Sequence, residues 1–193
     1  MKFMRQTILT LLALLIAITA SAQSADKLYA EGKAQYDAKN YAQAFPKLKD
    51  AAEKGHPKAQ YRLGRCYAKG LGTDGDASKA FLWYTKSAAQ DFAKAQYQLG
   101  KCYKNGDGVE KSATKAFEYF TKAAKQDNAD AQLALGKCYL RGRGVAADAA
   151  KAKTWFNRAV KNEKGGKKIL EELRKDAADG NEKAKEILAL IKK

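Results

Sequence analysis

The chain has 193 residues, of which 37 are Lys or Arg and 21 are Asp or Glu, so its formal net charge is +16. With 46% hydrophobic residues and only two prolines, the composition excludes a disordered or collagen-like chain. One histidine and three cysteines leave few ligands for a metal ion, which argues against a zinc enzyme. The apolar residues are mainly Ala, Leu and Tyr, and this favours helices over strands.

Residues 1–22 have the pattern of a secretory signal peptide. Lys2 and Arg5 precede an apolar run over residues 8–19, and Ala20-Ser21-Ala22 provides a small-x-small cleavage site. The run is shorter than the roughly 20 apolar residues of a transmembrane anchor, so we expect cleavage and no anchor. Cleavage removes two cations and leaves a net charge of +14. We therefore expect an exported protein, either periplasmic or secreted.

The remaining chain repeats itself with a period of 36 residues. The segment AQYRLGRCY at 59–67 returns as AQYQLGKCY at 95–103 and as AQLALGKCY at 131–139. A second block, an alanine followed by aromatic residues, keeps the same step. Its copies begin at Ala80, Ala116 and Ala152. The blocks are separated by the glycine pairs Gly70/Gly72, Gly106/Gly108 and Gly142/Gly144. Each unit is therefore predicted to hold two helices, A and B, joined by a glycine turn.

Polar and glycine residues at fixed columns refine this prediction. One column before each helix B holds good N-cap residues, namely Asn40, Asp76, Ser112 and Asp148. A glycine recurs inside each helix A, at Gly64, Gly100 and Gly136. Each such glycine costs about 1 kcal/mol relative to Ala, so its recurrence predicts close packing against a facing helix.

The two ends of the array depart from the regular unit. The turn of the first unit is four residues shorter, and Pro46 is expected to kink its second helix or to shift its start. After the break at Gly165-Gly166, two amphipathic helices around 169–173 and 187–191 are expected to form a C-terminal cap. The predicted segments are 1–22 (signal peptide), 23–58, 59–94, 95–130 and 131–164 (repeats), and 165–193 (capping helices).

The unit, with its L-G-x-C-Y, G-x-G and K-A motifs and its aromatic pair, resembles the Sel-one-like repeat, a relative of the tetratricopeptide repeat. The first unit, with its shorter turn, is more similar to a tetratricopeptide repeat proper. The resemblance covers about residues 26–164. It implies an all-α, right-handed solenoid of antiparallel helix pairs, with about four repeats of 32–36 residues. It also implies a scaffold or adaptor, with no active site and no cofactor.

The cysteines occupy a single column of helix A, at Cys66, Cys102 and Cys138. Packed helices lie about 8–10 Å apart, whereas a disulfide needs Cα atoms within about 7 Å. We therefore expect buried, unpaired thiols, and intermolecular bridging or thiol chemistry is the alternative. The resemblance implies that some exported relatives bridge helix B to the next helix A, but Ala88 and Gln96 stand at those columns here.

Two further columns of helix A form a candidate binding face. Directly after the helix-A glycine stand Lys33, Arg65, Lys101 and Lys137. Three residues before it stand Tyr29, Tyr61, Tyr97 and Leu133. Positions four residues apart share one helical face, and the resemblance implies that helix A lines the concave side. Cations beside tyrosines would suit an extended peptide with acidic groups or its C-terminal carboxylate. In the alternative interpretation the tyrosines belong to the core and the cations are solvated surface.

The leading hypothesis is an exported, non-enzymatic scaffold that binds an unidentified protein or peptide, for which acidic groups would suit the groove. The alternative is an electrostatic binder of polyanions, because helix B carries its own basic columns. Those columns are Lys79, Lys115, Lys151 and Lys86, Lys122, Arg158. Expected export and the lack of a nucleic-acid-binding motif argue against DNA or RNA as the polyanion.

A more remote alternative is an exported enzyme that binds or hydrolyses β-lactams. The S-x-x-K pattern occurs at Ser112–Lys115 and at Ser24–Lys27, but its S-D-N and K-T-G companions are missing. His56 stands between Gly55 and Pro57 and is expected to be a solvent-exposed loop residue. We assign no catalytic residue, metal ligand or cofactor.

Overall fold

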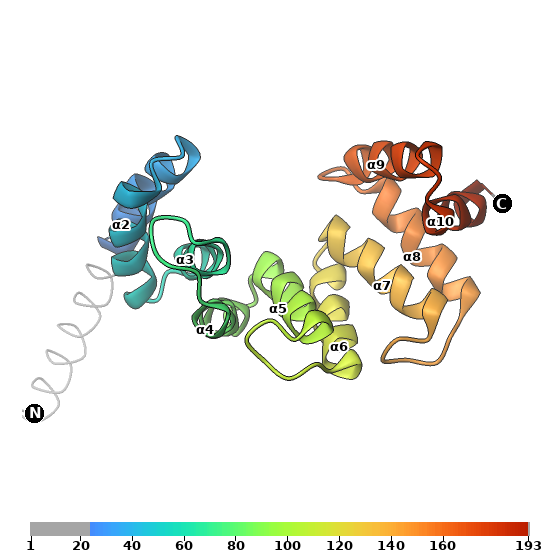
Figure 1. Cartoon of the computed structure of the whole chain (residues 1–193), viewed down its shortest axis with the longest axis horizontal. Coiled ribbons are helices and arrows are strands. Elements are labelled where there is room, and N and C mark those ends of the chain that lie inside the picture. Colours follow the sequence, from blue (N-terminus) through green and yellow to red (C-terminus); the bar gives the residue numbers. More distant parts are fainter. Residues whose placement is uncertain (1–23, 193) are drawn as a thin grey trace, which may run out of the picture. The chain divides into compact units, whose positions relative to one another are not determined.

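The computed structural model describes residues 24–192, so the signal-peptide prediction for residues 1–22 lies outside the described residues. The described chain is all-α, as predicted, and has no strand. A first helix over residues 24–37 is followed by α2 (Tyr41–Glu53), α3 (Pro57–Lys69), α4 (Ala77–Ala88), α5 (Ala93–Asn105), α6 (Ala113–Lys125), α7 (Ala129–Arg141), α8 (Ala149–Lys161), α9 (Gly166–Ala178) and α10 (Glu182–Lys192) (Figure 1).

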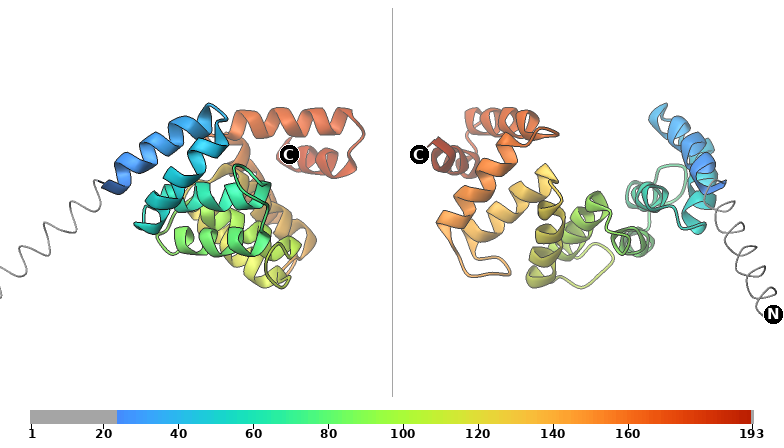
Figure 2. Two further views of the ribbon diagram at one scale, coloured as in Figure 1. Left: turned by 60° about the vertical axis from the view of Figure 1, so that its left-hand side comes forward. Right: turned by 180° about the vertical axis from the view of Figure 1, so that it is seen from behind.

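The chain divides into two compact units, an N-terminal unit that ends at Ser87 and a C-terminal unit that begins at Ala88. In the C-terminal unit, each helix packs on the next one along the chain, from α5 to α10. The pair α7 and α8 illustrates the arrangement, because the chain reverses direction between two helices that pack against each other (right-hand view of Figure 2). The predicted helices A correspond to α3, α5 and α7, and the predicted helices B to α4, α6 and α8.

The predicted turns form as expected. All six turn glycines have positive φ, between 62° and 87°, which suits glycine because it has no Cβ. Asp76, Ser112 and Asp148 each accept a hydrogen bond from the backbone N–H three residues later, as N-caps do. Asn40 was predicted to do the same, and this is wrong. In the shorter first turn its side chain makes no capping bond, and its Nδ2 donates instead to Gln35 Oε1 at 3.1 Å.

The prediction of close packing at the helix-A glycines is confirmed. A Cβ added to Gly64 would lie 2.7 Å from the Tyr84 ring, and one added to Gly100 would lie 2.5 Å from the Phe120 ring. At Gly136 it would lie 2.5 Å from the Phe156 ring. All three aromatic residues belong to helix B of the same pair and are buried. The glycine therefore lets the backbone of helix A rest directly on a ring of helix B.

Helices form at both ends of the array, where the sequence predicts a shortened first repeat and a C-terminal cap. Helix α2 begins at Tyr41 and continues past Pro46, so this proline does not set the start of the helix. At the other end, α9 begins at Gly166, next to the predicted break. Ile169 and Leu173 of α9 and Ile187 of α10 are buried in one cluster with residues of α8. The two C-terminal helices therefore cover apolar residues of α8, as a cap does.

A third column of helix A, to which the sequence pattern assigns no role, links successive elements. Gln60, Gln96 and Gln132 are buried. The Nε2 of Gln132 donates to the carbonyl of Ala124 at the end of α6, and its Oε1 accepts from Asn162 beyond the end of α8. Likewise Gln96 Oε1 accepts from Gln126 at 2.8 Å. Each buried amide thus has a polar partner at or near a helix end, and an amide buried without a partner would be costly.

The three thiols are buried, as predicted. Burial raises the pKa of Cys66 and of Cys102 to about 11 each, and it raises the pKa of Cys138 as well. Because the thiolate is the reactive form, these cysteines are poor nucleophiles at neutral pH. The structure therefore favours a packing role for this column over thiol chemistry.

The prediction for His56 is wrong, because its side chain is only 10% exposed. The ring stacks on Tyr29 with centroids 4.2 Å apart, and its Nδ1 accepts the Ala59 N–H at 3.1 Å as the N-cap of α3. Its Nε2 lies 3.4 Å from Asp26 Oδ1. His56 therefore joins the first helix to α3. Burial lowers the pKa of His56, an effect that Asp26 opposes.

The contact between Gly100 and Phe120 predicts that Gly100→Ala destabilises the protein. Overpacking costs about 1–3 kcal/mol, whereas the better helix propensity of Ala returns about 1 kcal/mol at most. We expect a net loss of up to about 2 kcal/mol in the free energy of unfolding, measured by urea denaturation. The loss should shrink in a Phe120→Leu background, since the smaller side chain makes room. A stabilised Gly100→Ala variant would contradict this packing.

The burial of His56 predicts a loss of stability in acid. Its pKa in the folded protein is below the ordinary 6.5, so the unfolded chain binds more protons in this range. Its contribution is fully present above about pH 6.5 and decreases as the pH falls through the folded pKa. His56→Asn keeps an N-cap acceptor without a titrating group, as Asn128 does for α7. Thermal melts at about pH 7.5 and 5 should show a larger loss for wild type than for His56→Asn, and parallel losses would contradict the prediction.

Candidate functional site

The first basic column of helix B takes part in the architecture of the repeat. The ammonium groups of Lys79 and Lys151 lie 3.1 and 3.0 Å from the carboxylates of the N-caps Asp76 and Asp148. The column also covers tyrosines of the preceding helix A. The distances from Nζ to the ring centroid are 5.6 Å for Lys79–Tyr67, 5.3 Å for Lys115–Tyr103 and 5.6 Å for Lys151–Tyr139. These lysine side chains thus cover the partly exposed tyrosine rings of each helix pair and keep solvent from them.

The second basic column of helix B lies over aromatic rings of its own helix. Lys86 is 4.3 Å from the centroid of Trp83, and Arg158 is 4.8 Å from that of Trp155. Lys122 lies over Tyr119 in the same way, at 5.2 Å. Each pair is spaced i, i+3, which places both side chains on one helical face. The cations of both helix-B columns therefore lie over aromatic rings that recur with the same period.

In the N-terminal unit, the predicted site residues divide between core and surface. Lys33 is exposed and pairs with Asp37 at 2.6 Å. Tyr29 is half-buried against His56, and its hydroxyl accepts from Arg62 Nε at 3.4 Å. Tyr29 thus supports the interpretation that part of the tyrosine column is core.

Arg65 and Tyr61 of the same unit lie together. The guanidinium of Arg65 is 6.0 Å from the centroid of Tyr61 and 5.5 Å from that of the buried Tyr36. The Tyr61 ring also approaches the ring of Tyr84 on α4, with centroids 6.1 Å apart. One side of Tyr61 therefore packs inward while Arg65 covers another side.

In the C-terminal unit, the structure brings the predicted residues into one pocket. A cavity of ≈470 Å³ lies between α5, α6 and α7, and Tyr97, Lys101, Leu133 and Lys137 all line it. The ring of Phe120 packs against the ring of Tyr97, with centroids 5.8 Å apart. The ammonium of Lys101 lies 5.9 Å from the centroid of the Tyr97 ring. Both interpretations of the tyrosine column therefore hold for Tyr97, which packs on the core and also lines a pocket.

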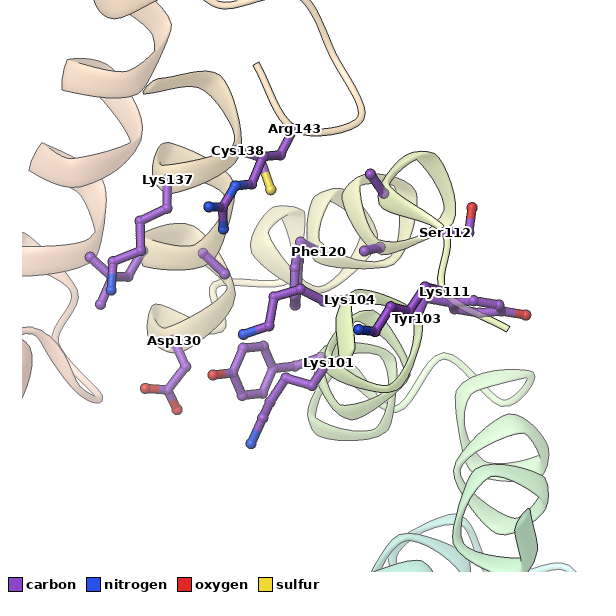
Figure 3. A pocket seen from close by; sticks show the side chains of 15 residues that line it. Lys101, Tyr103, Lys104, Lys111, Ser112, Phe120, Asp130, Lys137, Cys138 and Arg143 are labelled. Atoms are coloured by element: carbon purple, nitrogen blue, oxygen red, sulfur yellow. The ribbon is translucent and has the colours of Figure 1, made fainter. Parts of the chain in front are cut away.

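The pocket combines an apolar lining with a cationic rim. The apolar surface comes mainly from Tyr97, Phe120, Leu133, Ala134 and Cys138. The cations that line it are Lys101, Lys104, Lys111, Lys137 and Arg143. Figure 3 shows Lys101, Lys104, Lys137 and Arg143 around one opening, with Asp130 among them. Among the described residues that line the pocket, Asp130 is the one with a carboxylate. The pocket therefore suits a ligand with an apolar part and negative charge.

Lys137 is an exposed cation of this rim. The surrounding protein nevertheless disfavours its charged form and lowers its pKa. The positive charges of Lys104 and Lys183 act in the same direction, and Asp176 opposes them. An incoming carboxylate would relieve this unfavourable crowding of positive charge.

Sequence reasoning missed Lys104, Lys111 and Arg143. None of the three recurs at the 36-residue step, and their columns hold Ala68 and Leu140, Gly75 and Ala147, and Leu71 and Asp107. A search by period therefore passes over them. The signal that could have found Lys104 is its position one turn after Lys101, on the same face of helix A.

The serine of the S-x-x-K pattern is used in the fold. Ser112 Oγ accepts the Lys115 N–H at 3.3 Å as the N-cap of α6, and the ammonium of Lys115 lies over Tyr103. The two side chains therefore have structural roles, which weakens the β-lactam interpretation.

No group of three or more potential metal ligands occurs among the described residues. None of the helices described is long and apolar enough to cross a membrane.

Comparison with known proteins supports the repeat architecture. The family model described as Sel1 repeat matches residues 57–92, 93–128 and 129–163. No curated protein matches the sequence significantly. A solved Sel1 repeat protein from Oxalobacter formigenes is 36% identical with a TM-score of 0.66, over 69% of this chain and 55% of that chain.

Two further solved structures are similar. The protective antigen c5321 of uropathogenic Escherichia coli, which displays an SLR fold, is 30% identical with a TM-score of 0.70, over 86% of this chain and 36% of that chain. Helicobacter pylori cysteine rich protein B is 27% identical with a TM-score of 0.50, over 60% of this chain and 88% of that chain. The present chain thus spans about half of the Oxalobacter protein and about a third of the antigen. With three matched units over residues 57–163, the chain belongs to the Sel1 repeat family.

Proposed function

We propose that this protein is an exported, non-enzymatic scaffold that binds a protein partner through the helix-A face of its repeats. Sel1 repeats are commonly protein–protein interaction scaffolds, and this chain carries three matched units, which supports the proposal. The observation that carries the proposal is the pocket between α5, α6 and α7. There, residues of the helix-A columns meet around an apolar hollow with five cations in its lining.

Export is the part of the proposal that rests on sequence alone. Residues 1–22 combine a positive start, an apolar run and a small-x-small cleavage site, as secretory signal peptides do. Three buried thiols of raised pKa are compatible with an oxidising compartment, because the thiolate needed for disulfide exchange is disfavoured.

The polyanion alternative is less well supported than the groove. A polyanion binder would use both basic faces equally. Here the helix-B cations accompany caps and aromatic rings, at Lys79 and Lys151 for example, whereas the cations of the α5–α7 pocket surround a hollow. The two faces therefore differ in what they could hold, and an apolar hollow adds nothing to the binding of a polyanion.

The proposal predicts that charge reversal on the helix-A face releases the partner. We expect Arg65→Glu/Lys101→Glu to weaken binding by about tenfold or more, which is about 1.4 kcal/mol. The measurement is recovery of partners on the immobilised mature protein from the envelope fraction of its own cell, quantified by mass spectrometry.

The matched control is Lys86→Glu/Lys122→Glu, which makes the same charge change in both units on helix B. Both variants are first checked for wild-type helicity and melting temperature. Equal losses in the two variants, together with a steep dependence on salt, would support the polyanion alternative and overturn the proposal.

A further inference from the structure

The pocket between α5, α6 and α7 is part of a longer binding surface. Lys137 and Arg143 line this pocket, and they also line a second cavity of ≈160 Å³ between α7, α9 and α10. The second cavity is partly apolar, with Leu140, Leu173 and Ile187 in its lining. A Lys–Arg pair thus stands between two hollows, all within the C-terminal unit.

The first hollow is large enough to bind one bulky side chain of a ligand. Its volume of ≈470 Å³ falls in the range of about 300–1,000 Å³ in which ligands are commonly bound. Phe120 is buried beneath it, while Leu133 and Ala134 are half-buried along α7. Since Phe120 is fixed against Gly100, this wall is already in place before a ligand arrives.

The charge around the two hollows specifies the sign of the ligand. Five cations and one carboxylate line the first hollow. Lys137, Arg143 and Lys183 line the second, together with Asp176 and with Arg141, which is paired with Glu186 at 2.5 Å. Lys137 lies in both sets, and its pKa is already lowered by the crowding of protein and of positive charge around it. A carboxylate placed between Lys137 and Arg143 would restore favourable pairing for both cations.

From this arrangement we infer that the C-terminal unit binds an extended acidic peptide segment of its partner. A bulky apolar side chain of the peptide occupies the α5–α7 hollow, a carboxylate meets Lys137 and Arg143, and the peptide continues over the hollow at α9 and α10. The C-terminal helix pair is then part of the binding site as well as a cap. This inference rests on the proposed function and names the chemistry of its partner.

The test uses defined peptides and the mature protein. The probe is a fluorescein-labelled 12-residue peptide of Glu, Ser and Gly with one central Phe, and its binding is measured by fluorescence anisotropy. We expect replacement of the Phe by Ser, or of every Glu by Gln, to weaken binding by about tenfold or more. A peptide cut to the six residues around the Phe should also bind several-fold more weakly, because it no longer spans both hollows.

Protein variants locate the contacts. Lys137→Gln/Arg143→Gln should weaken binding of the probe by about tenfold. The matched control Lys122→Gln/Arg158→Gln removes the same charge from α6 and α8, the helices B of the C-terminal unit. It should change the affinity for the probe less than about twofold. Ala134→Trp, which fills the hollow, should abolish the preference for Phe over Ser while thermal stability stays near that of wild type. If Ala134→Trp does not fold, the Phe-to-Ser peptide still decides whether an apolar anchor is used.

Three results would overturn the inference. Equal binding of the Phe and Ser peptides would show attraction by charge alone. Equal losses in the two double variants would remove the Lys–Arg pair from the site. Binding of phenylacetate as tight as that of the probe would indicate a small anion as the ligand in place of an extended peptide. In each case, loss of the native partner in Arg65→Glu/Lys101→Glu would leave the proposed function standing, so the two failures are distinguishable.

Discussion

The close approach of helix A to helix B at a glycine is the contact on which the rest of the repeat depends. In the C-terminal unit Gly100 rests on Phe120 and Gly136 on Phe156, with no space for a Cβ. This contact fixes how helix A is rotated about its own axis, because one side of the helix must face the ring. The residue three before the glycine shares this face, so Tyr97 also packs against Phe120, whereas the residue after the glycine points to the neighbouring side of the helix. In this way a packing constraint positions Lys101 and Tyr97 at the pocket.

The excess of positive charge has two separate uses in this molecule. On helix B, cations such as Lys79 and Lys151 pair with the capping carboxylates and cover tyrosines of the preceding helix, which contributes to each repeat in the same way. Around the α5–α7 pocket, cations meet at one place and with few carboxylates nearby. The net charge of +16 is therefore distributed unevenly in its uses over the repeat. The distribution over the repeat separates structural charge from charge that is available to a ligand.

Most features that the sequence predicts correctly are those that recur. Turn glycines, the caps at Asp76 and Asp148, the buried thiols and the glycine inside helix A all appear at a 36-residue step, and each has one physical explanation. The predictions for Asn40 and His56 are wrong because they depend on the irregular first unit. There a shortened turn changes the geometry of the cap, and Tyr29 of the first helix covers the imidazole.

The pocket itself could be predicted only in part, for a related reason. Tyr97, Lys101 and Lys137 belong to repeated columns and are found by their period. A cation such as Arg143 stands in a turn at a column that holds different residues in the other units, and only the folded chain brings it to the same hollow. A site that distinguishes one place along an array must depart from the repeat, so periodicity alone does not reveal it.

We propose that partners meet the C-terminal unit on its helix-A side. The most direct test is a backbone amide NMR titration of the ¹⁵N-labelled mature protein with its purified partner. This proposal predicts that the largest chemical-shift changes fall at 97–104 and 133–143, with smaller changes near 181–187, the segments that line the two hollows. Changes concentrated instead around Lys122 and Arg158 on helix B would contradict it.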